Sequence, residues 1–245
     1  FGLKAALIPF HAWLPDAHPS APAPISAMLS GLLIKVSGIY ALTRILFTVF
    51  GLSPLLSNIL MGLGILSMVV AALLALGQRD MKRMLAYSSI SQVGYMILGI
   101  GLGTPLGILG GLFHLFNHAV AKGLLFLNSG SVQMATGTRN LDEMGGLAKR
   151  MPLTAATNLV GSLSIAGVPP LGGFWSKLII IMALVQAGRW PYAVVAVLAS
   201  VLTLWYYLLI QRKAFFGKLE ERWAGIREAP VWITAATVAL ALLCV

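Results

Sequence analysis

Four lysines lie inside apolar segments, where a charged side chain is costly. Lys35 is the clearest case, within LSGLLIKVSGIYALTRILF at 29–47, and the others are Lys4, Lys122 and Lys177. A charged lysine at the centre of a membrane helix costs about 2.5–3.5 kcal/mol on insertion scales, so four cost on the order of 10 kcal/mol. Burial disfavours the charged form, which lets a lysine exchange a proton near physiological pH. The lysines therefore indicate proton transfer, with snorkelling toward a helix end as the structural alternative.

Two histidines share a helix face with one of these lysines. In FHLFNHAVAKGLLFL, His114, His118 and Lys122 are spaced i, i+4 and i+8. On a helix they drift about 80° around the axis and rise about 12 Å, which makes a stripe of protonatable groups. Histidine titrates near neutral pH, so the stripe predicts a proton relay, with a hydrogen-bonded structural histidine pair as the alternative. A metal site is disfavoured because no acid or third ligand is nearby and HExxH is absent.

A break interrupts a later apolar segment. The prolines and glycines of GVPPLGG, 167–173, cannot continue a helix. Unpaired backbone at membrane depth is tolerated only inside protein or beside water, and broken helices near the midplane are typical of transporters. Lys177, four residues past the break, favours an ion site over the alternative of a simple loop between two short segments.

The composition places these residues in a membrane. The chain has 245 residues, of which 58% are hydrophobic and 10% charged, and its mean hydropathy is +0.89. A soluble domain is about 25% charged, and a membrane helix needs about 20 apolar residues. Long apolar runs recur at 55–76, 157–171, 193–210 and 230–245. The chain is therefore predicted to be an all-α polytopic membrane protein.

The apolar pattern divides the chain into segments. The first segment, 1–14, is too short to span alone, and the prolines of PDAHPSAPAP, 15–24, are expected to exclude a helix. The further segments run over about 25–50, 54–77, 85–102, 105–135, 152–187 with the break, 190–211, and onward from Pro230.

The basic residues indicate how these segments are oriented. If each segment from 25 onward spans once, three loops fall on one side and carry 11 of the 17 basic residues: Arg79, Lys82, Arg83, Arg139, Lys149, Arg150, Arg212, Lys213, Lys218, Arg222 and Arg227. The opposite side has Arg44 and Arg189. The positive-inside rule then predicts that the three basic loops face the cytoplasm. The net charge of +10 is explained by topology and needs no nucleic acid.

The acidic residues and the cysteine narrow the chemistry further. All seven acids fall in loops or connectors, so the predicted membrane part holds four lysines and no carboxylate. The lone Cys244 excludes a disulfide framework and a cysteine-based cluster. No glycine-rich dinucleotide fingerprint follows a strand. We expect no cofactor or metal, so any redox chemistry belongs to partner subunits and the chain has no catalytic residues of its own.

Four stretches carry a resemblance to a known family. They are KAALIPFHAWLPDAHPSAPAPISAMLSGLLIKV, DMKRMLAYSSISQVGY, FHLFNHAVAKGLLFLNSGSV and AGVPPLGGFWSKLIII. In order and over nearly the whole length, they resemble the antiporter-like subunits of respiratory complex I, Mrp-type sodium/proton antiporters and membrane-bound hydrogenases. Those subunits have about fourteen helices with two inverted five-helix repeats.

The resemblance implies a domain organisation for this chain. It would begin at about the seventh helix, so that 1–50 ends the first inverted repeat, 54–211 forms the second, and 212–245 is a basic connector with the start of a C-terminal transmembrane helix. The absence of an initial methionine and the apolar character of both ends also predict a fragment of a longer protein.

The resemblance also implies residue roles. Lys4 matches the lysine of the broken seventh helix, Lys35 the connecting lysine of the eighth helix, and Lys177 the terminal lysine of the broken twelfth helix. His114, His118 and Lys122 match the central relay helix. Some branches of the family carry glutamate at the position of Lys177 or histidine at that of Lys35. The family's fifth-helix glutamate, partner of the seventh-helix lysine, has no counterpart here.

These patterns predict a proton-translocating membrane subunit of a redox-driven or Mrp-type complex, with sodium coupling as an open possibility. Its expected partners are other membrane subunits and the lipid bilayer, in a prokaryotic cell membrane. Two alternatives remain, a freestanding cation/proton antiporter and a non-transporting scaffold subunit whose lysines bind lipid head groups or fix helix packing. The complete complex would be an ion-translocating oxidoreductase of the NADH dehydrogenase or hydrogenase type.

Overall fold

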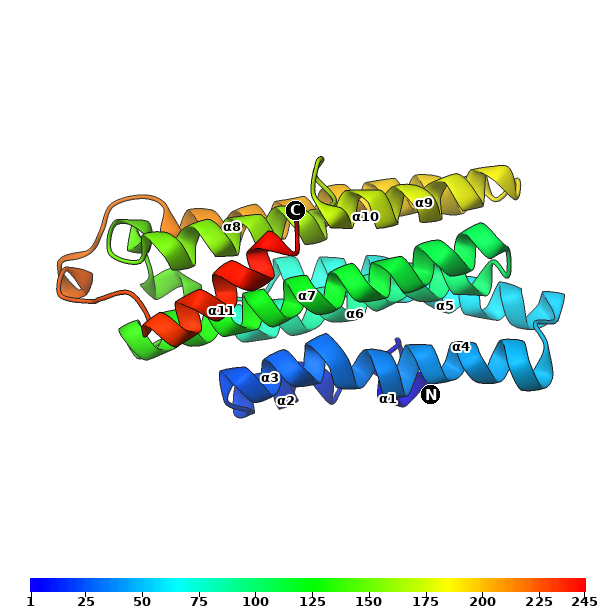
Figure 1. Ribbon diagram of the computed structural model, residues 1–245, viewed down its shortest axis with the longest axis horizontal. Coiled ribbons are helices and arrows are strands. Elements are labelled where there is room, and N and C mark those ends of the chain that lie inside the picture. Colours follow the sequence, from blue (N-terminus) through cyan, green and yellow to red (C-terminus); the bar gives the residue numbers. More distant parts are fainter.

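The computed structural model describes all 245 residues and is built of helices (Figure 1). The N-terminal part contains two short helices, α1 (Gly2–Ala5) and α2 (Leu14–Ser20), followed by one long span, Ala23–Phe50. This span alternates α-helical and π-helical turns: α3 (Ala23–Met28), η1 (Leu29–Leu33), η2 (Lys35–Tyr40), α4 (Ala41–Ile45) and η3 (Leu46–Phe50). The expected span at 25–50 is present.

The remaining helices follow the predicted segments closely. They are α5 (Pro54–Leu76), α6 (Met81–Gly101), α7 (Pro105–Thr136), α8 (Pro152–Ala166), α9 (Gly172–Gln186), α10 (Trp190–Ile210) and α11 (Val231–Leu242). Short turns η4 (Leu141–Glu143), η5 (Leu147–Lys149), η6 (Gln211–Phe215) and η7 (Glu221–Trp223) lie in the connections. The all-α prediction is confirmed, and the predicted break falls between α8 and α9.

Local capping signals set the helix boundaries. Ser53 accepts a hydrogen bond from the amide of Leu56, and Pro54 opens α5 at a position where no N–H is needed. Thr104 caps α7 in the same way, followed by Pro105. At the other end of α7, Gly137 adopts a left-handed conformation with φ 72°, which favours glycine.

The prediction that 15–24 excludes a helix is wrong. Helix α2 covers Leu14–Ser20, with Pro15 in its first turn, where a missing N–H costs nothing, and Pro19 in its last. The chain leaves the helix only at Ala21, which is extended because Pro22 follows it. The interruption is therefore confined to a tight turn between α2 and α3.

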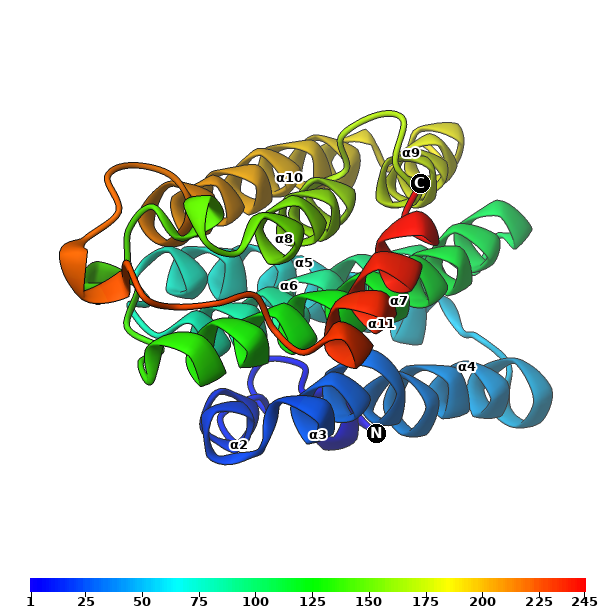
Figure 2. The ribbon, with the colours of Figure 1, turned by 60° about the vertical axis from the view of Figure 1, so that its left-hand side comes forward.

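The helices form three layers around a central, polar helix (Figures 1 and 2). The N-terminal elements lie on one side, α5, α6 and α7 in the middle, and α8, α9 and α10 on the other, while α11 crosses α7 and α8. Four helices are long and apolar enough to cross a membrane: Ala23–Phe50, Pro54–Leu76, Pro105–Thr136 and Trp190–Phe215. Helix α6 is not among them, because its serines make it more polar. It is buried along almost its whole length, so its surroundings are protein and not lipid.

The three basic connections lie together at one end of the bundle. Asp80, before α6, and Asn140, after α7, form a β-bridge. Lys213, after α10, pairs with Asp142 at 2.5 Å. Hydrogen bonding by the Lys213 ammonium holds the pKa of the exposed Asp142 carboxyl below its ordinary value. The expectation that these loops share one side is therefore confirmed.

Candidate functional site

Lys122, a residue of the predicted relay, is fully enclosed. Its side chain is 0% exposed. The ammonium on α7 donates to the carbonyl of Leu85 at 2.8 Å, to Oγ of Ser88 and to the hydroxyl of Tyr207 at 3.1 Å. Helix α6 supplies the first two acceptors and α10 the third. Neutral oxygens therefore saturate the three donors of an ammonium without a carboxylate.

The two histidines of the stripe differ in their hydrogen bonding. Nδ1 of His114 lies 2.9 Å from Oγ of Ser176 on α9, and Nε2 lies 3.1 Å from Oε1 of Gln92 on α6. His118 is equally buried, but neither ring nitrogen has a hydrogen-bond partner. The ring centroids are 6.2 Å apart. His114 is fixed from two sides, and His118 is held only by packing.

Lys177 folds back onto the helix break. It lies in α9, is 3% exposed, and donates to the carbonyl of Ala166, the last residue of α8, at 3.3 Å. Carbonyls at a helix C-terminus lack partners within the helix and carry partial negative charge, which suits a cation. The ammonium also lies 4.5 Å from the ring centroid of Tyr95. The break therefore creates the acceptor that Lys177 uses.

Lys35 begins the second π-helical stretch of the long span. Its side chain is 0% exposed and its ammonium donates to the carbonyl of Ser30 on the preceding turn. The Ser30 hydroxyl in turn lies 2.8 Å from that of Ser89 on α6. π-Helical turns often lie at functional sites, and here they surround the lysine in sequence.

Lys4 is separate from this group. It lies in the last turn of α1, is exposed, and lines a cavity of about 400 Å³ together with Trp13, Leu33 and Ser37. No hydrogen bond or ion pair joins Lys4 to the other predicted residues. The structure thus gathers Lys35, His114, His118, Lys122 and Lys177 around α6 and α7, and leaves Lys4 outside.

No carboxylate meets the buried lysines. The ion pairs of the chain involve Asp16, Asp80, Asp142 and Glu220, all with arginine or Lys213 in the polar connections. Burying an isolated ammonium is costly, so these lysines depend on hydrogen bonds to neutral oxygens or on loss of the proton.

The sequence analysis missed one buried histidine. His18 on α2 is 0% exposed, and both of its ring nitrogens lack hydrogen-bond partners. Its ring stacks on Phe126, with centroids 4.4 Å apart. The same Phe126 ring also lies near the predicted relay, because its centroid is 5.8 Å from the Lys122 ammonium. Assigning 15–24 to an irregular loop hid this residue.

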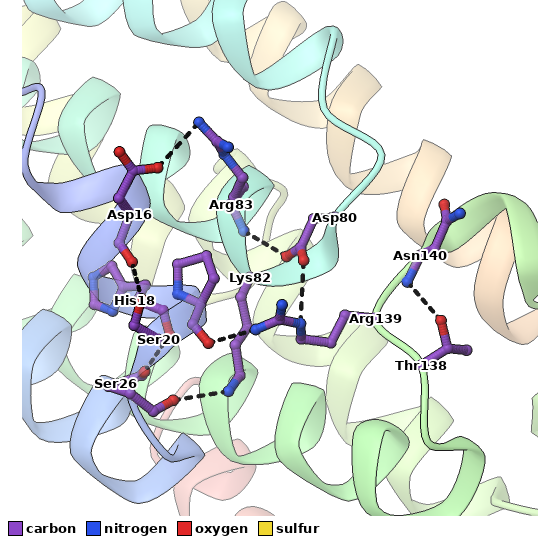
Figure 3. Close-up of polar contacts among 12 residues, drawn as sticks. Asp16, His18, Ser20, Ser26, Asp80, Lys82, Arg83, Thr138, Arg139 and Asn140 are labelled. Carbon is purple, nitrogen blue, oxygen red and sulfur yellow. Dashed lines mark hydrogen bonds and ion pairs between the residues drawn. The ribbon is translucent and has the colours of Figure 1, made fainter.

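Charged side chains hold the turn that follows His18 (Figure 3). Arg139 pairs with Asp80 at 3.2 Å and also donates to the carbonyl of Pro19. Lys82 donates to the carbonyl of Ala21 at 3.0 Å. Arg83 pairs with Asp16 at 3.3 Å. We call these contacts the cationic clamp.

The cationic clamp borders a cavity that opens at the basic end of the bundle. The cavity has a volume of about 470 Å³ and is lined by Lys82, Gly130, Gln133 and the turn at 19–24. The turn that follows His18 therefore borders open space.

The sequence analysis also missed the hydrogen-bond partners of the predicted relay residues on α6 and α10. Ser88, Gln92 and Tyr207 are each at most 1% exposed and contact relay residues directly. The i, i+4 spacing of Ser88 and Gln92 within the stretch DMKRMLAYSSISQVGY was the available signal. Tyr207 lies in an apolar segment, where no sequence pattern indicated a role for it.

Two curated proteins are similar to this chain over most of its length. The NADH-quinone oxidoreductase subunit N of Desulforudis audaxviator is 40% identical over 223 residues, which is 90% of this chain and 44% of that protein. A Na(+)/H(+) antiporter subunit from Alkalihalophilus pseudofirmus is 40% identical over 219 residues, 89% of this chain and 44% of that protein. The chain thus spans less than half the length of these relatives.

A solved structure and a family model agree with these relatives. The structure of the Mrp complex from Dietzia sp. contains a chain that superposes with a TM-score of 0.93 at 30% identity, covering 99% of this chain and 53% of that one. Residues 1–203 match the family described as NADH:quinone oxidoreductase/Mrp antiporter, transmembrane. The chain therefore belongs to the NADH:quinone oxidoreductase/Mrp antiporter membrane family.

Proposed function

We propose that this chain is the relay-bearing part of a proton-translocating, antiporter-like membrane subunit. The observation that carries the proposal is the group of three enclosed lysines, Lys35, Lys122 and Lys177, with neutral hydrogen-bond acceptors and no carboxylate. Such a group cannot hold three permanent charges in a dry interior, because each added proton raises the cost of the next. Sharing fewer protons than sites is what a relay requires.

The path runs through the middle of the bundle. Protons pass along Lys35, Lys122, His118, His114 and Lys177, which α6 and α7 hold together. Lys4 belongs to the path as its switch. We infer that it pairs with an acid from outside these 245 residues, for which the family's fifth-helix glutamate is the candidate, and that separating the pair sends its proton toward Lys35.

We assign cytoplasmic access to the cavity at the basic end. It lies beside Lys82 and the turn at 19–24, which follows the buried His18 of α2. His18 contacts Phe126, whose ring also lies near the Lys122 ammonium.

The same proposal assigns the complete protein a membrane, an orientation and partner subunits. The subunit works in a prokaryotic cell membrane with its basic connections in the cytoplasm, beside other membrane subunits, and moves protons, with sodium as the alternative ion. Residues 1–50 end one inverted repeat, 54–211 form the next, and 212–245 are the connector and start of a further span. If the protein is instead a freestanding antiporter, the subunit should purify alone, without other membrane subunits.

The central test uses Lys122 in the complete subunit within its complex. Lys122→Ala should stop proton pumping without loss of assembly. Lys122→Arg should fail as well, because arginine does not release its proton in proteins. Full pumping by the arginine variant would exclude the relay, and full pumping by a Lys122→Gln variant would favour the scaffold alternative.

Orientation is tested by labelling. Single cysteines at Arg79, Lys149 and Lys218, in a Cys244→Ser background, should react with a membrane-impermeant maleimide from the cytoplasmic side only. Cysteines at Gly51 and Arg189 should react only from the opposite side. A mixed result among the first three would overturn the orientation.

A further inference from the structure

Helix α10 carries a polar stripe within an otherwise apolar helix. Its exposed face is formed by large apolar side chains such as Val201, Trp205 and Leu208, which suit lipid. Its inner face carries Thr203, Tyr206 and Tyr207, each at most 1% exposed. A buried hydroxyl is costly without a partner, so the stripe needs an explanation that packing against lipid does not give.

Two of these hydroxyls form cross-links with α6. Tyr207 lies 3.0 Å from Oγ of Ser88, and Thr203 accepts from Nε2 of Gln92 at 3.4 Å. Helices α6 and α10 run antiparallel, so moving one turn forward on α6, from Ser88 to Gln92, moves one turn backward on α10, from Tyr207 to Thr203. The two contacts are therefore successive rungs between the same helices.

Each rung holds one end of the α7 stripe. The Ser88–Tyr207 rung accepts from the Lys122 ammonium through both hydroxyls. The Gln92–Thr203 rung contacts Nε2 of His114 through Oε1 of Gln92 at 3.1 Å. Lys122 and His114 are thus fixed by matched structures eight residues apart.

The middle of the stripe has no rung. His118 lies halfway between His114 and Lys122 in sequence, and both of its ring nitrogens are buried without partners. Most buried polar groups in proteins are paired, so an unpaired histidine within a stripe of titratable groups indicates a functional role.

We propose that Tyr207, with Ser88, is a positioning residue that fixes Lys122, and that Gln92 does the same for His114, so that His118 is the one movable carrier between two fixed sites. A ring without hydrogen bonds can reorient toward either neighbour, whereas a fixed donor and acceptor keep the transfer distance constant. This inference rests on the proposed relay and adds α10 to it.

The test compares two adjacent tyrosines in the complete subunit within its complex. Tyr207→Phe removes the hydroxyl that contacts Lys122 and keeps the ring, whose centroid lies 5.7 Å from the ammonium. Tyr206→Phe removes a buried hydroxyl that has no hydrogen-bond partner. Hydrogen bonds to charged groups are strong enough to displace a titration by about one to two pH units. Tyr207→Phe should therefore displace the pH profile of pumping by this amount and lower its rate about tenfold.

Tyr206→Phe should leave the rate and the pH profile unchanged. Equal effects of both substitutions would assign the role to packing and overturn the proposal, as would a normal profile for Tyr207→Phe. If Tyr207→Phe does not assemble, Ser88→Ala removes the same rung from α6 and should displace the profile likewise, with Ser88→Thr restoring it.

Lys122→Ala, measured alongside, separates this inference from the proposed function. If that variant pumps normally, the relay itself is wrong. If it is inactive while Tyr207→Phe and Ser88→Ala behave as wild type, only the role of α10 fails.

Discussion

The chain contains two helix breaks that place lysines in opposite environments. The first lies between α1 and α2, and Ala6 ends α1 in a left-handed conformation with φ 54°. The second lies between α8 and α9, where Gly167 has φ 87°. Lys4, before the first break, is exposed, whereas Lys177, after the second, is 3% exposed.

The difference comes from what surrounds each break. At the second, Asn117 of α7 donates to the carbonyl of Gly172 at 2.8 Å, and the amide of Gly172 donates to the carbonyl of Cys244 at 2.9 Å. Neutral hydrogen bonds from neighbouring elements therefore hold this break in place. The first break is also held by a neutral contact, because the amide of Ile8 donates to Oγ of Ser67 on α5 at 3.0 Å, but its side near Lys4 opens into a cavity. The two lysines therefore differ because neighbouring helices cover Lys177 and leave Lys4 open.

The largest expected effect on proton pumping lies at the second break, beside the buried Lys177. Lys177→Ala should lower proton pumping at least tenfold with assembly intact, because the terminal acceptor of the path is lost. Lys177→Arg should not restore it, since the guanidinium keeps its proton. Proton uptake by vesicles containing the complete complex gives the measurement. Pumping near the wild-type rate in either variant would remove Lys177 from the path.

Proton transfer from Lys4, at the first break, should instead depend on an acid outside these 245 residues. In the complete protein, neutralising that acid should impair pumping about as much as Lys4→Ala, and the double change should add little more, because the two groups act as one pair. When the same acid change is combined with Lys177→Ala, the two reductions in pumping should add as independent effects. The hypothesis is wrong if the complete protein and its neighbours offer Lys4 no membrane-embedded Asp or Glu.

Matched glycine substitutions compare how tightly the two breaks are packed. A Cβ on Gly173 would overlap the carbonyl oxygen of Ser164, whereas a Cβ on Gly2 would lie 3.1 Å from the side chain of Phe10, which can move. Gly173→Ala should destabilise the protein by about 1–3 kcal/mol. Gly2→Ala should change stability by less than about 1 kcal/mol. Thermal unfolding in detergent compares them, and equal shifts would contradict the difference in packing at these two glycines.

The smallest effects are expected at the cationic clamp. Arg139→Gln removes an ion pair and a contact to Pro19, and should cost about 1–2 kcal/mol, because its side chain is 30% exposed. Arg79→Gln is the control, since that side chain is 81% exposed, and it should cost less than about 0.5 kcal/mol. High salt should reduce the Arg139 effect but leave that of Gly173→Ala unchanged. An Arg139 effect insensitive to salt would show that the clamp does not act by charge.

The sequence by itself determined the elements and much of the candidate site. Proline and capping residues marked the starts of α5 and α7, and glycine marked the ends of α7 and α8. The spacing of His114, His118 and Lys122 predicted their common face, because helical periodicity is a local property. The shared side of the basic connections followed from counting spans.

Only the tertiary structure decided which of these residues are enclosed. Lys4 and Lys177 look alike in sequence, each beside a break, but neighbouring helices surround only Lys177. The same holds for His18, which an apparent loop conceals, and for Tyr207, which reaches Lys122 from 85 residues away. Periodicity reports which face of a helix is apolar or polar. It does not report which distant helix packs there, and in a membrane protein that neighbour determines whether a polar group meets water, lipid or another polar group.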